Sequence, residues 1–251
     1  MNPTITDWKG KRVWLIGASS GIGAALAGEL ARRGVRLAIS ARNARKLQRT
    51  AINGALPVPC DVTDTDSLAE ARSTVLAALG GIDLVVYLAG DYVPMRASDF
   101  DLTRAEQVVA VNFNGAMRLA ACVLPTLHAG GGIAFVASVA GYRGLPKALC
   151  YGPGKAALIH FAECLHLDLA QQGIGVWLIN PGFVQTRLTT RNDFTMPALL
   201  TPEQAATAAV DGFRTGRFEI HFPKRFTRVL KLLSLLPYRW YFPLIRRLTG
   251  T

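Results

Sequence analysis

Three residues in the middle of the chain have the types and the spacing of a proton-transfer site. Ser138 follows the apolar run 133–137, Tyr151 comes 13 residues later, and Lys155 lies four positions beyond Tyr151. On a helix, residues four apart lie one turn apart on the same face. A free tyrosine has a pKa of about 10, and a nearby ammonium favours the phenolate, which eases proton exchange. The three residues predict acid–base chemistry at a carbonyl or hydroxyl oxygen.

Alternating strands and helices are expected to position these residues. Apolar runs that read as strands alternate with helical patterns, which implies right-handed crossovers and a parallel sheet covered on both faces. The sequence predicts an α/β, doubly wound, Rossmann-like domain over residues 1–222 and a basic extension over 223–251. Residues 188–200 are typical of a mobile lid. The predicted strands are 12–16, 36–40, 84–88, 133–137, 175–179 and 218–222, and the predicted helices are 22–34, 67–79, 103–127, 151–170 and 202–215.

A glycine-rich turn follows the first predicted strand. Gly17-Ala18-Ser19-Ser20-Gly21-Ile22-Gly23 has G-x-x-x-G-x-G spacing and opens the first predicted helix. Glycines at these positions allow a tight turn and let a pyrophosphate approach the N-terminus of a helix. The strand–turn–helix context favours a dinucleotide site over glycines that serve a turn alone.

The end of the second predicted strand bears on which cofactor binds. No acidic residue stands there to bond a ribose 2′-hydroxyl, and the strand ends Ser40-Ala41-Arg42. A guanidinium can pair with a 2′-phosphate, with help from the Ser19 hydroxyl, so NADP is favoured over NAD. The alternative is that Arg42 is a solvated surface cation. Asp61, expected at the end of a third strand, suits either the adenine amino group or a cap on the next helix.

At this point the chain closely resembles the short-chain dehydrogenase/reductase family, over nearly its whole length to about residue 222. Besides the residues above, the matching motifs are Asp61-Val62, Ala89-Gly90, Asn112-Phe113-Asn114-Gly115 and the run 181–186. The resemblance implies an enzyme that transfers a hydride between a nicotinamide cofactor and a carbonyl group or secondary alcohol.

The resemblance also implies a role for each matching residue. Tyr151 would be the acid/base, and Ser138 would hold the substrate oxygen. Lys155 would bind the nicotinamide ribose and lower the pKa of Tyr151, while Asn112 would keep a water in the proton relay. The implied cofactor-binding residues are Gly17, Ser19, Ser20, Gly21, Ile22, Gly23, Arg42, Asp61, Val62, Ala89, Gly90, Tyr151, Lys155, Pro181, Gly182, Val184 and Thr186, the last two at the nicotinamide carboxamide.

Three positions depart from the family pattern. Ile16 stands where a threonine usually precedes the first glycine, and Tyr87-Leu88 replaces a pair of asparagines. Gly152-Pro153-Gly154 separates Tyr151 from Lys155. Because proline is tolerated only in the first turn of a helix, we expect this helix to begin close to Tyr151.

The charge of the chain is concentrated at its C-terminal end. The formal net charge is +11, and the segment from Phe222 onward has seven Lys and Arg residues and no acid, so 11 − 7 = 4 belong to the rest. Residues 224–236 predict an amphipathic helix, with basic residues opposite an apolar face and two intruding leucines, Leu232 and Leu235. Aromatic residues beside arginines favour an anionic membrane surface. Packing on the protein itself or on a partner subunit is the alternative. The apolar face consists of Phe226, Val229, Leu230, Leu233 and Leu236.

The composition of the chain limits where in the cell the protein is expected and which partners it can bind. The chain has neither a signal-like N-terminus nor a continuous apolar run of about 18 residues, and its four cysteines are scattered without metal-ligand spacing. We therefore expect a cytoplasmic protein with reduced thiols and no metal, peripheral on the membrane through residues 223–251. Leucine-rich and aromatic runs suit phosphates poorly, so we expect no nucleic acid. The family implies a homo-oligomer, a dimer or tetramer paired through helices 103–127 and 151–170.

Two other functions are compatible with the same fold. One is a catalytically silent nucleotide-binding sensor or membrane-associated scaffold, and the other is epimerisation or dehydration. The presence of Asn112, Ser138, Tyr151 and Lys155 together favours the active oxidoreductase. The basic extension points to an apolar, lipid-like carbonyl or alcohol as the small-molecule substrate.

Overall fold

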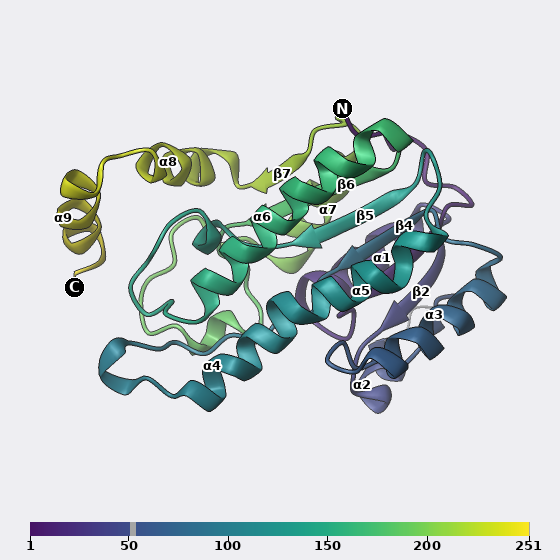
Figure 1. Ribbon diagram of the computed structural model, residues 1–251, viewed down its shortest axis with the longest axis horizontal. Helices are drawn as coiled ribbons and strands as arrows, with labels where there is room; N and C mark the ends of the chain where they lie inside the picture. The colour runs from purple at the N-terminus through teal and green to yellow at the C-terminus, as the bar shows by residue number, and fades with distance from the viewer. Residues whose placement is uncertain (51–53, 251) are drawn as a thin grey trace.

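A parallel sheet runs through the middle of the molecule, and helices cover both of its faces (Figure 1). The computed structural model describes residues 1–50 and 54–250, so Thr251 of the predicted extension lies outside it. Within these residues the sheet has seven strands in the order β3-β2-β1-β4-β5-β6-β7. Each neighbouring pair is parallel. This arrangement confirms the predicted doubly wound α/β fold.

The strands and helices follow the predicted alternation. The strands are β1 (Arg12–Ile16), β2 (Arg36–Ser40), β3 (Leu56–Pro57), β4 (Leu84–Tyr87), β5 (Gly132–Val136), β6 (Gly175–Pro181) and β7 (Glu219–Phe222). The helices are α1 (Gly21–Arg32), α2 (Ala44–Thr50), α3 (Thr65–Leu79), α4 (Leu102–Val109), α5 (Gly115–Val123), α6 (Tyr151–Leu169), α7 (Pro202–Phe213), α8 (Lys224–Ser234) and α9 (Tyr238–Thr249).

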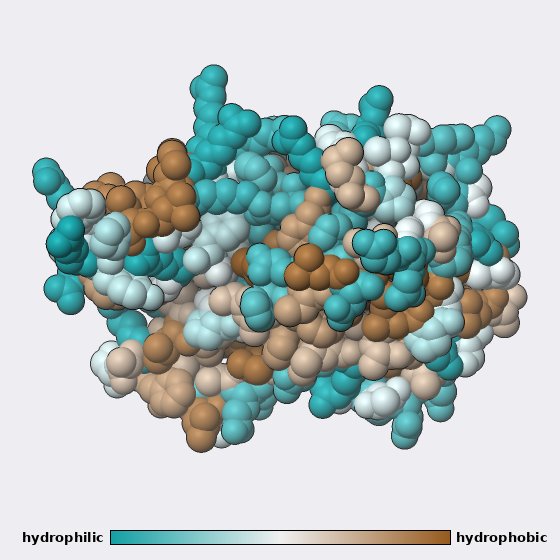
Figure 2. All heavy atoms as spheres, turned by 45° about the horizontal axis from the view of Figure 1, so that its top comes forward, coloured by the Kyte–Doolittle hydropathy of each residue, from teal (hydrophilic) through white to brown (hydrophobic). Residues whose placement is uncertain are grey.

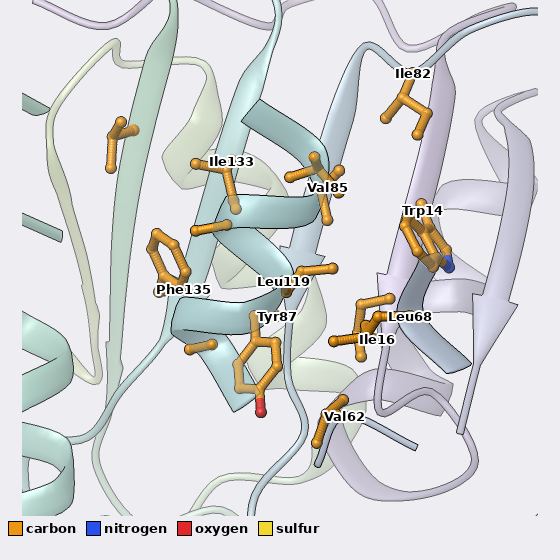
Figure 3. Close-up of a cluster of buried hydrophobic side chains, with 14 of the residues drawn as sticks. Trp14, Ile16, Val62, Leu68, Ile82, Val85, Tyr87, Leu119, Ile133 and Phe135 are labelled. Atoms are coloured by element: carbon orange, nitrogen blue, oxygen red, sulfur yellow. The ribbon is translucent and has the colours of Figure 1, made fainter. Parts of the chain in front are cut away.

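The strands are apolar throughout because both faces of the sheet are buried. In β1, Trp14 and Ile16 point into one apolar cluster, while Val13 and Leu15 belong to the cluster on the opposite face. Figure 3 shows part of the first cluster, where Trp14, Ile16 and Phe135 extend from the sheet. The two clusters hold the sheet between its helical layers, so the ends of the strands have fixed positions.

The predicted long helix over residues 103–127 is one helical path with a change of winding. Between α4 and α5, Ala110–Asn114 form a π-helix. The Tyr87 hydroxyl, at a position where the family has asparagine, donates to the Val111 carbonyl at this point. By length and composition Leu102–Thr126 is the one stretch of the described residues that is apolar enough to cross a membrane. Leu119 and Val123 are fully buried in the apolar cluster on one face of the sheet, so one side of this stretch belongs to the core.

Three elements differ from the sequence prediction. The third strand ends at Pro57, so Asp61 lies in the loop beyond it. Helix α2 is short and buries one side chain, Leu47, which leaves little periodic signal. Helix α9 contains Pro243, a residue that normally interrupts a helix. Tyr241 and Ile245 are buried on one side of α9, and this packing supports the helix where local sequence preference opposes it.

Candidate active site

A cleft of about 920 Å³ lies at the carboxyl ends of the strands. This is the edge of an open α/β sheet at which ligands bind. Every residue that the sequence predicted to bind the cofactor lines this cleft, and so do Ser138, Tyr151 and Lys155. Asn112 is buried behind the lining, although its neighbours Ala110 and Val111 reach it.

The glycine turn approaches the chain after β4 more closely than a side chain would permit. Gly17 has a φ of +95°, and a Cβ atom there would lie 2.5 Å from the backbone nitrogen of Ala89. A Cβ on Gly23 would lie 2.3 Å from the Gly17 oxygen. The Ser40 carbonyl accepts hydrogen bonds from the backbone N–H groups of Gly17 (2.7 Å) and Ala18 (3.0 Å). The turn is thus fixed by β2 and β4 on either side.

The N-terminus of α1 faces the same cleft and supplies positive charge without a cation. Ser20 is the N-cap, and its side chain makes no capping hydrogen bond. Helix N-termini with free N–H groups favour anions such as pyrophosphate. Ile16, which replaces the family's threonine, accepts through its carbonyl from the Leu88 N–H at 2.7 Å. A backbone bond therefore ties this turn to the neighbouring strand end, and the residues present fit a dinucleotide.

Arg42 and Asp61 lie together at the far end of the cleft. Burial alone would raise the pKa of Asp61, but hydrogen bonds from the Thr63 N–H (2.9 Å) and hydroxyl (2.7 Å), together with the Arg42 charge, lower it overall. The alternative that Asp61 caps the next helix is wrong. Asp64 is the N-cap of α3 and accepts from the N–H groups of Asp66 and Ser67.

Helix α6 begins at Tyr151 and places Lys155 one turn later. Pro153 falls in the first helical turn, as expected, where its missing N–H has no partner to lose. A Cβ on Gly152 would lie 3.3 Å from the Ala140 oxygen, so glycine lets α6 start close to the loop that follows Ser138. The Lys155 ammonium is buried, donates to the Val136 carbonyl at 2.8 Å, and lies 5.7 Å from the centre of the Tyr151 ring.

Burial moves the pKa values of Tyr151 and Lys155 in opposite directions. Removal from water disfavours both charged forms. Burial raises the pKa of Tyr151, and a hydrogen bond from Ser138 offsets part of that rise. Burial lowers the pKa of Lys155 to about 8. We expected Tyr151 to have a lowered pKa, and its net shift is upward instead, because desolvation outweighs the favourable contacts of the phenolate.

Asn112 joins the π-helix to the loop after β4. Its side-chain oxygen accepts from the Asp91 N–H at 2.9 Å, and its amide donates to the Asp91 carbonyl at 2.8 Å. A Cβ on Gly90 would lie 3.1 Å from the same oxygen and 3.8 Å from the Lys155 nitrogen. Asn112 therefore positions the backbone beside Lys155. Its role in holding a water remains a prediction.

Tyr92, which the sequence did not single out, packs against Tyr151. The ring of Tyr92 meets that of Tyr151 edge to face, with centres 5.0 Å apart. The Tyr92 hydroxyl donates to Asn192 at 2.8 Å, and Arg191 donates to the Tyr92 carbonyl. Lys147 pairs with Asp193 in the same segment. The segment predicted as a lid from its mixture of polar and apolar residues thus contacts Tyr92, which in turn packs on Tyr151.

Comparison with known proteins identifies the family. The model of the family described as short chain dehydrogenase matches residues 11–196. An uncharacterized oxidoreductase of Myxococcus xanthus (strain DK1622) is 35% identical over 240 residues, which cover 92% of this chain and 95% of the relative. The chain belongs to the short-chain dehydrogenase/reductase family and is a nicotinamide-dependent oxidoreductase.

Other relatives and solved structures agree with this assignment. An uncharacterized oxidoreductase of Staphylococcus aureus (strain USA300) is 30% identical over 200 residues, covering 77% of this chain and 87% of the relative. A short chain dehydrogenase from Burkholderia cenocepacia J2315, solved in complex with NADP, superposes with a TM-score of 0.76 at 24% identity, over 86% of this chain and 96% of the other. That likeness shows the fold.

Substitution of Gly17 tests the close backbone approach in the cleft. Gly17→Ala should lower the free energy of unfolding by about 2–5 kcal/mol, because a strained φ costs roughly 1–2 kcal/mol and backbone overlap adds roughly 1–3 kcal/mol. Gly10→Ala is the matched control, since Gly10 has a φ of +74° and nothing within 4 Å of a Cβ. It should cost about 1 kcal/mol. Urea denaturation measures both, and equal costs would contradict the proposed clash.

Proposed function

We propose that the protein is an NADP(H)-dependent carbonyl reductase or alcohol dehydrogenase that acts on an apolar, lipid-like substrate, with Tyr151 as the acid/base. The observation that carries this proposal is the convergence of Ser138, Tyr151 and Lys155 in one cleft with the glycine turn. Ser138 lies close enough to Tyr151 to offset part of the rise in the Tyr151 pKa, and Lys155 is buried one helical turn away. These groups can act on one substrate oxygen.

The chain's own residues supply the proton and the positioning. NADPH would lie along the glycine turn and Arg42, and when bound it supplies the hydride. The Tyr151 hydroxyl donates its proton to the carbonyl oxygen, and the Ser138 hydroxyl holds that oxygen in place. The ammonium of Lys155 favours the phenolate that remains on Tyr151. Burial keeps Tyr151 protonated at neutral pH, so its hydroxyl is available as the proton donor for carbonyl reduction.

The preference for NADP rests on the cation after β2. Arg42 is exposed in the cleft, and the strand that precedes it ends without an acidic residue. The Burkholderia enzyme was solved with NADP, and an actinorhodin polyketide ketoreductase that superposes with a TM-score of 0.76 at 23% identity was solved with NADPH. These neighbours support the proposal.

An apolar substrate suits the surroundings of Tyr151. The Tyr92 ring packs on Tyr151, and Leu188 lines the cleft. Next to this region the rings of Phe194, Phe183 and Phe226 form a row with successive centres 5.7 Å apart. We propose that this aromatic row receives the hydrocarbon part of a long ketone or alcohol.

We further propose a cytoplasmic homo-oligomer. The four cysteines are free thiols, which suits a reducing compartment. Helices α5 and α6 carry exposed apolar side chains, among them Met117 and Leu167, the latter 74% exposed. Contact between copies would cover them.

The central test is NADPH oxidation with ketones of graded chain length. Wild type should be active, with rates that rise with chain length, and Tyr151→Phe should lower kcat by roughly 10²–10⁴-fold, because the proton donor is lost. Tyr238→Phe, at an exposed tyrosine of α9, is the control for loss of a phenol and should keep the wild-type rate. NADPH binding without oxidation of any ketone would favour the silent sensor or scaffold.

Arg42 is tested by comparing the two cofactors. Arg42→Ala should weaken NADPH binding roughly 10–100-fold, since a charge-assisted hydrogen bond contributes about 1.5–3 kcal/mol, and should leave NADH binding unchanged. Arg49→Ala, at an exposed arginine of α2, is the matched control. Fluorescence titration measures both cofactors. An equal loss for NADPH and NADH would overturn the proposed role.

The lowered pKa of Lys155 predicts a pH profile. Its ammonium is present below a pKa of about 8 and is lost as the pH rises through that value. The rate of carbonyl reduction should therefore fall above pH 8, whereas the raised pKa of Tyr151 places its own titration higher. Lys155→Met should be slow at every pH, without this fall. Steady-state rates from pH 6 to 10 provide the check, and a flat wild-type profile would contradict it.

A further inference from the structure

Helices α8 and α9 carry apolar side chains on their outer surface. Figure 2 shows hydrophobic residues gathered beside hydrophilic ones at the end of the molecule that bears these helices. Leu232 of α8 is 67% exposed, and Leu235, which follows the last residue of α8, is 80% exposed. The same surface includes the exposed side chains of Val229, Trp240, Phe242 and Leu248. We call these six residues the outer face.

The opposite side of α8 is already used by the protein itself. The Phe226 ring lies 5.7 Å from that of Phe183, and Thr227 is fully buried. Lys231 forms an ion pair with Glu219 of β7. Leu230 and Leu233 line a small hollow against the body of the domain. The sequence placed Val229 with this packed side, but it is exposed, so the packing alternative accounts for the inner side of α8 and leaves the outer face uncovered.

Arg143 fixes the position of both helices relative to the active site. It lies in the loop that follows Ser138 and donates to the carbonyls of Ser234 (2.8 Å) and Leu236, in the turn between α8 and α9. Its guanidinium also lies over the rings of Tyr238 (4.5 Å) and Tyr241 (4.1 Å). The helices that carry the outer face are thus held in place by the loop that follows Ser138. The outer face is therefore exposed although its helices are fixed on the domain.

The cations around the outer face are unpaired. Six exposed basic residues belong to α8 and α9, and none forms an ion pair with a carboxylate of residues 1–50 or 54–250; the sequence from Phe222 to the end has no Asp or Glu. They are Lys224, Arg225, Arg228, Arg239, Arg246 and Arg247. Exposed apolar side chains surrounded by such cations match a surface that offers both hydrocarbon and negative charge.

We propose that the outer face docks on a bilayer that contains anionic lipids. Leucines and Trp240 would enter the boundary between headgroups and acyl chains, and the six cations would contact the lipid phosphates. A second copy of this chain would bring the same cations against one another. A nucleic acid would supply phosphates but would leave Leu232 and Leu235 in water. Of these three partners, only the anionic bilayer matches both the exposed apolar side chains and the cations around them.

The proposal is tested by co-sedimentation of the full-length protein with vesicles. Wild type should pellet with vesicles of equal parts phosphatidylglycerol and phosphatidylcholine, less so as salt is raised, and should stay in solution with phosphatidylcholine alone. Leu232→Gln with Leu235→Gln should lower the partition coefficient about tenfold or more. Leu102→Gln, at a leucine 60% exposed on α4, is the matched control and should bind as wild type does.

The electrostatic part has its own pair of variants. Arg228→Gln with Arg246→Gln should lower the partition coefficient roughly 25-fold, at about fivefold for each cation. Arg214→Gln with Arg217→Gln removes two exposed cations outside α8 and α9 and should have little effect. Circular dichroism of each variant establishes that it is folded.

Three results would overturn the proposal. The first is equal sedimentation of wild type and the outer-face variants. The second is a wild-type protein that binds no vesicles but is a dimer in light scattering, with the leucine variants monomeric. The third is binding of a DNA duplex in place of vesicles. Sedimentation requires no turnover. The result therefore stands apart from whether the protein reduces ketones.

Discussion

The contact between the backbones of Gly17 and Ala89 is the constraint on which the site depends. It joins the ends of β1 and β4 at a distance that excludes any Cβ atom. The Ser40 carbonyl of β2 also accepts hydrogen bonds from this turn, so backbone contacts join the ends of three strands. Side chains near this point are left free for chemistry. Arg42 and Ser138 reach the resulting cleft from loops that follow β2 and β5, and Tyr151 reaches it from the first turn of α6.

Much of this architecture could be predicted from sequence because its signals are local. β1 and β2 have the predicted bounds, and α6 begins at Tyr151 because proline can occupy only a first turn. The glycine spacing also required no knowledge of distant residues. The residues expected at the cleft then followed from the rule that parallel strands present their carboxyl ends at one edge. The order of the strands in the sheet depends on contacts between distant segments and was not predicted.

The features that sequence did not predict depend on contacts between distant segments. Tyr92 lies on Tyr151 through a hydrogen bond to Asn192, 100 residues away. Helix α9 forms despite Pro243 because Tyr241 packs inward and its hydroxyl bonds the Gly144 carbonyl. The upward pKa shift of Tyr151 was missed for a related reason: helical spacing reveals a neighbouring cation but not the extent of burial.

The burial of Lys155 has a consequence for ligand binding. With a pKa near 8, this group is only partly protonated in mildly alkaline solution. An anion that enters the cleft beside it favours the ammonium, and thermodynamic linkage then requires the protein to take up a proton as the anion binds. The heat of binding will therefore include the ionisation heat of the buffer, in proportion to the protons exchanged. Affinity for the anion is coupled to pH through a lysine that solvent scarcely reaches.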